Sequence, residues 1–191
     1  MNNYSTLCSN LKRGILRFSE KICDGLSRPE FKFVSQMIYG ILSSQSCHLS
    51  KIARSLDEKI TLKKIIDRLS FNLNSFVNGE KLFFNYIRKV KGCISEKTIL
   101  IVDDSDITKP CSSKLEGLGV VRDGSTGKLG TGYHTIGVTA LTPGKKQPVG
   151  VYTRVYSASE KDFVSADAET LKALRFLGKH FKKEKWYAGR V

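Results

Sequence analysis

A run of aliphatic residues that leads into three aspartates constrains the fold of this chain more than any other feature. The run extends from Thr98 to Asp106 and has the sequence TILIVDDSD. Its β-branched and aliphatic residues predict a buried strand, and we expect this strand to place the carboxylates at its C-terminal end. Carboxylates grouped in this way repel one another unless a cation or a basic ligand shares the site. Hard divalent ions such as Mg²⁺ bind oxygen ligands of this kind, whereas the alternative interpretation is a surface turn rich in Asp.

The charge of the chain favours a polyanionic partner. Its 191 residues include 32 Lys and Arg against 18 Asp and Glu, which gives a formal net charge of +14. Residues 1–98 hold 17 basic against 8 acidic side chains, and residues 99–191 hold 15 against 10, so the excess is present in both parts. Nucleic acid is the commonest partner of such a chain, and a basic but unspecialised surface is the alternative.

The cysteines and the hydropathy of the chain predict a reduced, soluble, cytoplasmic protein. The 5 cysteines are scattered and include no C-x-x-C pair, so neither a zinc site nor a disulfide framework is indicated. The apolar stretches are too short to cross a bilayer, and no signal peptide is recognisable. We therefore expect no membrane partner.

The first half of the chain has the periodicity of helices. Apolar residues recur at helical spacing in three stretches, which cover residues 31–42, 49–56 and 62–73. Ser50 and Thr61 are candidate N-caps for the second and the third stretch.

The second and third stretches together have the outline of a helix-turn-helix. In that motif the second helix enters the major groove, which would bring Lys63, Lys64 and Arg68 close to DNA. Any small helical bundle has the same outline, so a plain helical domain is the alternative. We expect residues 1–94 to form a helical region that is a candidate for DNA binding.

From Thr98 onwards the pattern is that of strands. A polar, glycine-rich segment over residues 109–131 follows the aspartates and is expected to be a loop. Two segments joined by a Pro-Gly turn then predict an antiparallel hairpin of residues 133–141 and 149–156. The elements expected after it are a helix over residues 167–177, with Ala168, Leu171, Leu174 and Leu177 on one face, and a strand over residues 186–188.

The aspartates also match the D-x-D-x-T pattern of haloacid-dehalogenase-like phosphatases. In this alternative, Asp104 would be the nucleophile and Asp106 the general acid. Those enzymes have a parallel sheet, so a helix should follow the motif strand. Here a glycine-rich segment and a hairpin follow it instead, and a phosphatase of small molecules gives no reason for a charge of +14.

The order of elements and several short motifs resemble the DDE transposases of bacterial insertion sequences. The matching segments are Ile99–Pro110, Glu116–Gly117, Arg122–Ser125 and Gly130–His134. The resemblance covers residues 95–191 well and the helical half more loosely. It implies an α+β chain in which residues 95–191 form an incomplete ribonuclease-H-like domain of three antiparallel strands, a helix and a fourth strand.

The resemblance also assigns chemistry to Asp104. In the family the first catalytic Asp precedes a Ser or Thr at the end of the first strand, and Asp104 is followed by such a residue. The family's reaction is the hydrolysis and strand transfer of DNA phosphodiesters by two Mg²⁺ ions, which three carboxylates hold. Asp104 is therefore the expected catalytic residue and metal ligand.

Other polar residues nearby are weaker candidates. Asp103 would point to the opposite face of the strand from Asp104, and Asp106 is also a weaker metal ligand. Asp123 is expected to make a turn in the glycine-rich segment. His134 is expected to be structural or to contact DNA, because the family's chemistry needs no His.

The second and third carboxylates of the family have no counterpart in this chain. The second belongs to a segment of the form W-[apolar]-x-D-R-G, and the segment that begins at Trp186 reads WYAGRV, with Gly189 in the place of the Asp. The third is a Glu far downstream. We therefore expect a transposase fragment that binds DNA without activity of its own, and whose Mg²⁺ binding is weak or absent.

The expected partners of such a fragment are the duplex DNA of transposon ends, a full-length transposase and other copies of itself. A DNA-binding repressor without catalysis is the alternative.

Overall fold

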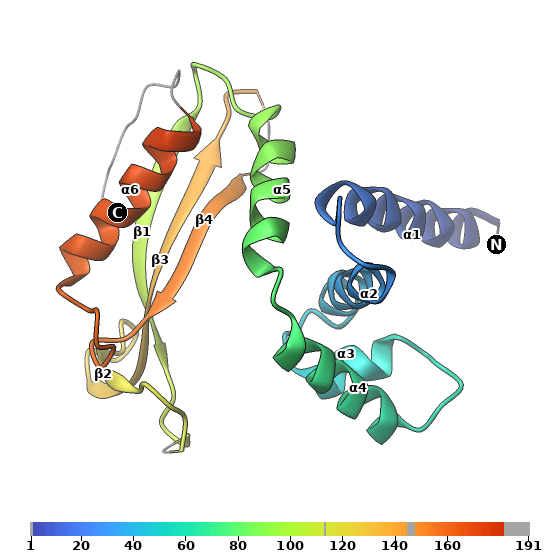
Figure 1. Ribbon diagram of the computed structural model, residues 1–191, viewed down its shortest axis with the longest axis horizontal. Coiled ribbons are helices and arrows are strands. Elements are labelled where there is room, and N and C mark those ends of the chain that lie inside the picture. Colours follow the sequence, from blue (N-terminus) through green and yellow to red (C-terminus); the bar gives the residue numbers. More distant parts are fainter. Residues whose placement is uncertain (1, 113, 145–147, 182–191) are drawn as a thin grey trace. The chain divides into compact units, whose positions relative to one another are not determined.

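The chain divides into two compact units, Met1–Lys89 and Val90–Val191 (Figure 1). The computed structural model describes residues 2–112, 114–144 and 148–181. The first unit is helical and the second is built on an antiparallel sheet, so the chain is α+β, as the sequence predicts. The units divide a few residues before the boundary expected between residues 94 and 95.

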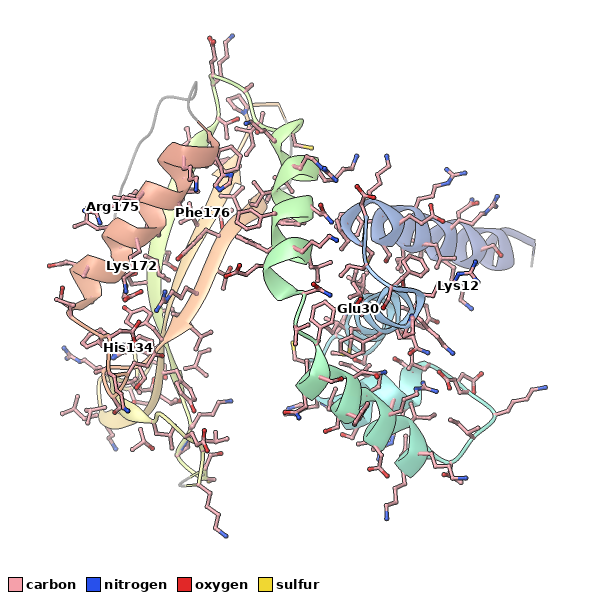
Figure 2. All side chains as sticks on the ribbon, in the orientation of Figure 1. Lys12, Glu30, His134, Lys172, Arg175 and Phe176 are labelled. Atoms are coloured by element: carbon pink, nitrogen blue, oxygen red, sulfur yellow. The ribbon has the colours of Figure 1, made fainter. Side chains whose placement is uncertain are left out.

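The described residues of the first unit form a succession of helices. These are α1 (Asn2–Ile22), α2 (Arg28–Ser44), α3 (Leu49–Ser55), α4 (Leu62–Ser75) and α5 (Gly79–Lys91), which runs two residues past the end of the unit. The start of α2 is fixed by a capping box, in which the Glu30 carboxylate (Figure 2) accepts a hydrogen bond from Ser27 N at 2.9 Å and Ser27 Oγ accepts one from Glu30 N.

The two expected N-caps have different outcomes. Thr61 is the N-cap of α4, although its side chain makes no capping hydrogen bond. The N-cap of α3 is His48 rather than Ser50, so that prediction was wrong by two residues. The chain turns just before α3 because Ser46 Oγ accepts a hydrogen bond from His48 N at 3.2 Å.

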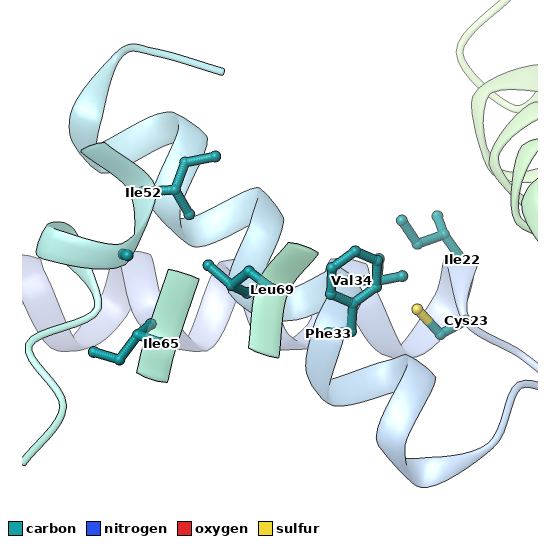
Figure 3. Packing of buried hydrophobic residues seen from close by; sticks show 8 residues of the cluster. Ile22, Cys23, Phe33, Val34, Ile52, Ile65 and Leu69 are labelled. Atoms are coloured by element: carbon teal, nitrogen blue, oxygen red, sulfur yellow. The ribbon is translucent and has the colours of Figure 1, made fainter. Parts of the chain in front are cut away.

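The core of the first unit is an apolar cluster drawn from four helices and the turn after α1 (Figure 3). Its buried members are Ile22, Cys23, Phe33, Val34, Ile52, Ala53, Ile65 and Leu69. The three periodic stretches of the sequence therefore supply most of this core. Leu42 and Leu73 belong to the same stretches but are exposed, in the last turns of α2 and α4.

Gly40 allows α2 and α3 to approach closely. A Cβ atom at this position would clash with Cγ2 of Ile52, a side chain that is completely buried. A glycine inside a helix is normally unfavourable, so this one is explained by the contact that it permits.

The second unit is built on a sheet whose described strands are all antiparallel. The strands are β1 (Ile99–Thr108), β2 (Gly119–Arg122), β3 (Leu129–Leu141) and β4 (Val149–Tyr156). The long strand β3 is central, with β1 along one edge and both β4 and β2 along the other. The pairing of β3 with β4 confirms the hairpin that the sequence predicts.

The glycine-rich segment contains a strand that was not expected. Its residues 119–122 form β2, which pairs with the first residues of β3 from Gly119↔Gly132 to Arg122↔Leu129. The prediction that all of residues 109–131 form a loop was therefore wrong at these positions. The strand expected at residues 186–188 lies outside the described residues.

Helix α6 (Ala166–His180) covers one face of this sheet (Figure 1). Ser165 begins the helix, because its Oγ accepts a hydrogen bond from Ala168 N at 3.1 Å. The helix buries Glu169, Ala173 and Leu177. The face predicted from the leucines was therefore rotated from the true one, and Leu171 is 50% exposed.

Among the helices of the described residues, none combines the length and the apolar character that a membrane span requires.

Candidate functional site on the covered face of the sheet

The three aspartates lie within β1 and not at its end. The strand continues to Thr108 because its pairing with β3 continues, with Asp104 opposite Ile136 and Asp106 opposite His134. The prediction that the carboxylates mark the C-terminal end of the strand was therefore wrong. Their place in the strand fixes the direction of each side chain.

The alternation of the strand separates the aspartates. Asp104 and Asp106 share a face with Leu100, which is buried, whereas Asp103 points to the opposite face. Tyr152 on β4 packs against Phe176 on α6 at a ring distance of 5.2 Å, which identifies the face of Asp104 as the one that α6 covers. Asp104 itself is exposed to solvent.

Asp106 is held by two partners from neighbouring strands. Its Oδ1 lies 2.6 Å from Nδ1 of His134 on β3 (Figure 2), and its Oδ2 accepts a hydrogen bond from the backbone N–H of Arg122 on β2 at 3.0 Å. Both side chains of the pair are about three-quarters buried. Asp106 therefore joins three strands, and His134 has the structural contact that was one of its two expected roles.

Tyr156 extends this polar cluster. Its ring stacks on His134 at 5.4 Å and on Phe163 at 6.0 Å, and the residue is buried. Burial raises the pKa of the Tyr156 hydroxyl, and the nearby carboxylates of Asp104, Glu169 and Asp106 raise it further. The hydroxyl of Tyr156 therefore lies in a negative potential to which both β1 and α6 contribute.

An ion-pair network attaches α6 to this face. Glu169 is only 1% exposed, with its Oε2 at 3.0 Å from Arg154 Nε on β4 and its Oε1 at 2.5 Å from Lys172 Nζ. Arg154 also lies 3.7 Å from a carboxylate oxygen of Glu160. These contacts place two basic side chains beside a carboxylate in the core.

Sequence reasoning missed this network, although one signal pointed to it. Arg154 alternates with Tyr152 and Tyr156, so all three side chains belong to one face of β4. An Arg between two inward-pointing aromatic residues requires a buried or half-buried acid as its partner. The acid on the following helix was available at Glu169.

The described residues do not form a site that could hold two divalent ions. No group of three or more His, Cys, Asp or Glu side chains suited to a metal is present among them. Asp104 stands exposed, and the carboxylate of Asp106 is occupied by His134 and the Arg122 amide. Mg²⁺ at Asp104 therefore stays a prediction, and Gly189 lies outside the described residues.

Asp123 makes the turn that was expected of it. Its Oδ1 accepts hydrogen bonds from Ser125 N at 2.8 Å and from Ser125 Oγ at 2.6 Å. The hydroxyl of Ser125 is the main reason that the pKa of Asp123 lies below its usual value. The carboxylate thus closes the loop between β2 and β3.

The basic residues proposed for DNA binding lie on α4 in the first unit, in different environments. Lys63 and Lys64 are exposed in the first turn of the helix. Arg68 is half-buried and donates two hydrogen bonds to Glu58, at 2.6 and 2.8 Å. Glu58 also accepts one from Gln36 at 2.7 Å, so the charge of Arg68 is neutralised inside the unit.

Comparisons with models of known protein families, with curated proteins and with solved structures gave no match to this chain.

Proposed function

We propose that this chain belongs to a DDE transposase of an insertion sequence, and that it binds the DNA of the transposon ends. The observation that carries the proposal is the position of Asp104. It is exposed on β1, is followed by Ser105, and lies in an antiparallel sheet that is followed by a helix on the same face. Strands β1, β3 and β4, the helix and the Asp-Ser pair support the ribonuclease-H-like catalytic domain that the sequence resemblance implies, whereas β2 is additional to it.

Phosphodiester transfer requires more carboxylates than the described residues bring to Asp104. Asp106 is engaged by His134, and Glu169 is neutralised by Arg154 and Lys172. We therefore propose hydrolysis and strand transfer with Mg²⁺ only for a site to which other carboxylates contribute. For the described residues the proposal is DNA binding.

The charge of the chain supports a DNA ligand. The net charge of +14 is distributed over both halves, and Lys63 and Lys64 are exposed on a helix that packs against α3. This helix pair also favours a second candidate function, DNA recognition by a repressor-like protein without catalysis. The phosphatase alternative receives no such support, because the strand that carries D-x-D-x-T is in an antiparallel sheet.

The DNA on either side of the coding sequence of this chain provides a test of the proposal. Overlapping duplex fragments of that DNA would be labelled and titrated with the full chain in about 0.1 M salt, with shuffled fragments as controls. A transposase should prefer one sequence that recurs in inverted orientation on both sides. A repressor should prefer a site on the upstream side alone. Equal affinity for flanking and shuffled fragments would contradict both functions.

The two lysines of α4 can be tested in the same assay. The double variant Lys63→Gln/Lys64→Gln should bind more weakly, and the slope of log K against log salt should fall by about 1.8 if both contact phosphates. Arg68→Gln is excluded from this comparison because it would remove the ion pair with Glu58. Unchanged affinity and slope would show that α4 is not the DNA-binding surface.

A further inference from the structure

The hairpin of β2 and the start of β3, residues 119–132, has one buried and one exposed face. We refer to it as the β2–β3 ribbon. On the buried face Val121 is 1% exposed, and a Cβ atom at Gly132 would clash with the carbonyl oxygen of Ile107. On the exposed face Val120 is 65% exposed and Leu129 is 75% exposed. The close packing on one side therefore presents the other side to solvent.

The exposed face of the ribbon combines apolar and cationic side chains. Its four residues are Val120, Arg122, Leu129 and Thr131, which form cross-strand pairs. Arg122 is exposed, and its Nε donates a hydrogen bond to the carbonyl of Gly127 at 3.3 Å, which holds the guanidinium beside the turn. Lys128 is exposed next to the turn.

The one acid of the ribbon, Asp123, offsets one of these two charges. The Asp123 carboxylate is occupied by the backbone and hydroxyl of Ser125. The ribbon therefore has a net charge of +1, and two large apolar side chains lie on its exposed face. Neighbouring exposed apolar side chains with polar residues around them are typical of interaction sites.

Three contacts hold the ribbon and the residue that precedes it in place. Asp106 Oδ2 accepts from Arg122 N at 3.0 Å, Lys109 N donates to Thr131 O at 2.7 Å, and Ser159 Oγ donates to Leu118 O at 3.0 Å. A ribbon held in this way loses little conformational entropy when it binds a ligand.

We propose that the exposed face of the β2–β3 ribbon inserts into a groove of duplex DNA. The major groove admits a two-stranded ribbon, and known β-ribbon proteins bind DNA in this way. Arg122 and Lys128 complement the phosphates, while Val120 and Leu129 contact sugars and thymine methyl groups. The face lies on the opposite side of the sheet from Asp104, so this contact is separate from the catalytic position. The inference rests on the proposed function, because it names the surface with which this chain would bind DNA.

The test compares variants of the full chain for binding to a fluorescein-labelled, mixed-sequence duplex of about 30 base pairs, near the size of specific sites. Arg122→Gln/Lys128→Gln should weaken binding about tenfold or more in about 0.1 M salt and lower the salt slope by about 1.8. Val120→Thr/Leu129→Thr should weaken binding without changing the slope. The matched control is Arg175→Gln/Lys179→Gln on α6, where Arg175 points away from the sheet (Figure 2), and it should bind within twofold of the wild type.

The outcomes separate this inference from the proposed function. If the wild type binds and both ribbon variants match the control, the inference fails and DNA binding stands. If the wild type binds no duplex, the proposed function fails and the inference falls with it. If Val120→Thr/Leu129→Thr binds DNA normally but abolishes self-association in sedimentation, the face binds protein and the DNA assignment is overturned. Circular dichroism must show that each variant is folded.

Discussion

At the scale of single residues, Glu169 illustrates how a charged side chain can belong to a core. It lies on the buried face of α6, with Arg154 beside one carboxylate oxygen and Lys172 beside the other. Removing either cation would leave the buried carboxylate with a single basic partner to offset the cost of taking Glu169 out of water. The position of α6 on the sheet therefore depends on charge as well as on apolar packing.

The first residue-scale prediction concerns Arg154. Arg154→Met should lower the free energy of unfolding of the second unit by about 2–4 kcal/mol, because Glu169 then keeps only Lys172 as a partner. Arg175→Met on the exposed side of α6 is the matched control and should change stability by less than about 0.5 kcal/mol. Urea denaturation followed by circular dichroism measures both. Equal effects of the two variants would contradict the role given to Glu169.

The second residue-scale prediction concerns the pH dependence of stability. The hydrogen bonds from Arg68 are the main reason that the pKa of Glu58 lies below its ordinary value of 4.5. A carboxyl group with a depressed pKa stabilises the folded state above its unfolded pKa, and this contribution is lost as the pH falls through the folded pKa. The wild type should therefore lose about 1 kcal/mol more than Arg68→Met when the pH falls from about 6 to about 3.

Denaturant titrations at a series of pH values test this difference. The carboxyl groups other than Glu58 are common to both proteins, so their contributions cancel in the comparison. Parallel pH profiles for the wild type and Arg68→Met would show that the ion pair with Glu58 does not stabilise the fold.

At the scale of secondary-structure elements, α2 and α3 can cross closely because residue 40 is a glycine and has no side chain. Gly40 faces Ile52 at the point of closest approach, so the geometry of the pair is fixed by the absence of a Cβ atom. In contrast, Gly14 in α1 has no atom within 4 Å of the position that a Cβ would occupy. The two glycines offer a matched pair of substitutions.

Gly40→Ala and Gly14→Ala should have opposite effects on stability. The first gains helix propensity but overpacks the contact with Ile52, and should lower the free energy of unfolding by about 1–3 kcal/mol. The second should raise it by about 0.5–1 kcal/mol. Adding Ile52→Leu, which removes the clashing Cγ2, should recover part of the loss at Gly40. Equal effects at the two glycines, measured by thermal or urea unfolding, would argue against a close crossing.

At the scale of the whole molecule, the sequence predicts the class of each unit better than it predicts the contacts inside it. The helical stretches and the hairpin are local patterns, and the Pro143-Gly144 turn has the positive φ that a glycine supplies, 80° at Gly144. Strand β2 was missed because it is short and surrounded by glycines, and its partner on β3 lies beyond the turn. The composition of residues 119–122 does not indicate that they pair with another segment.

In the candidate site, too, the local pattern of the sequence predicts some positions, whereas the contacts between distant residues could not be predicted. The pattern of the strand places Asp104 and Asp103 on opposite faces, which depends only on the alternation of side chains. The contact of Asp106 with His134 joins residues 28 positions apart, so it depends on the register of β1 against β3. Glu169 was not among the residues predicted for the covered face of the helix, because charged residues are rarely buried. Tertiary pairing therefore decides the contacts of Asp106 and Glu169, whereas alternation alone decides the faces of Asp103 and Asp104.

Within the described residues, β3 is the strand that pairs with β1, and the other edge of β1 carries backbone donors and acceptors of its own. Such an edge is a template for intermolecular β-sheet growth, and negative charges along a strand are a common protection against it. Asp103 and Asp104 are exposed on the two faces of this strand, and we expect their negative charges to oppose such growth. Replacing Asp104 by a neutral residue to probe catalysis would also weaken this protection. We expect such a variant to yield less soluble protein.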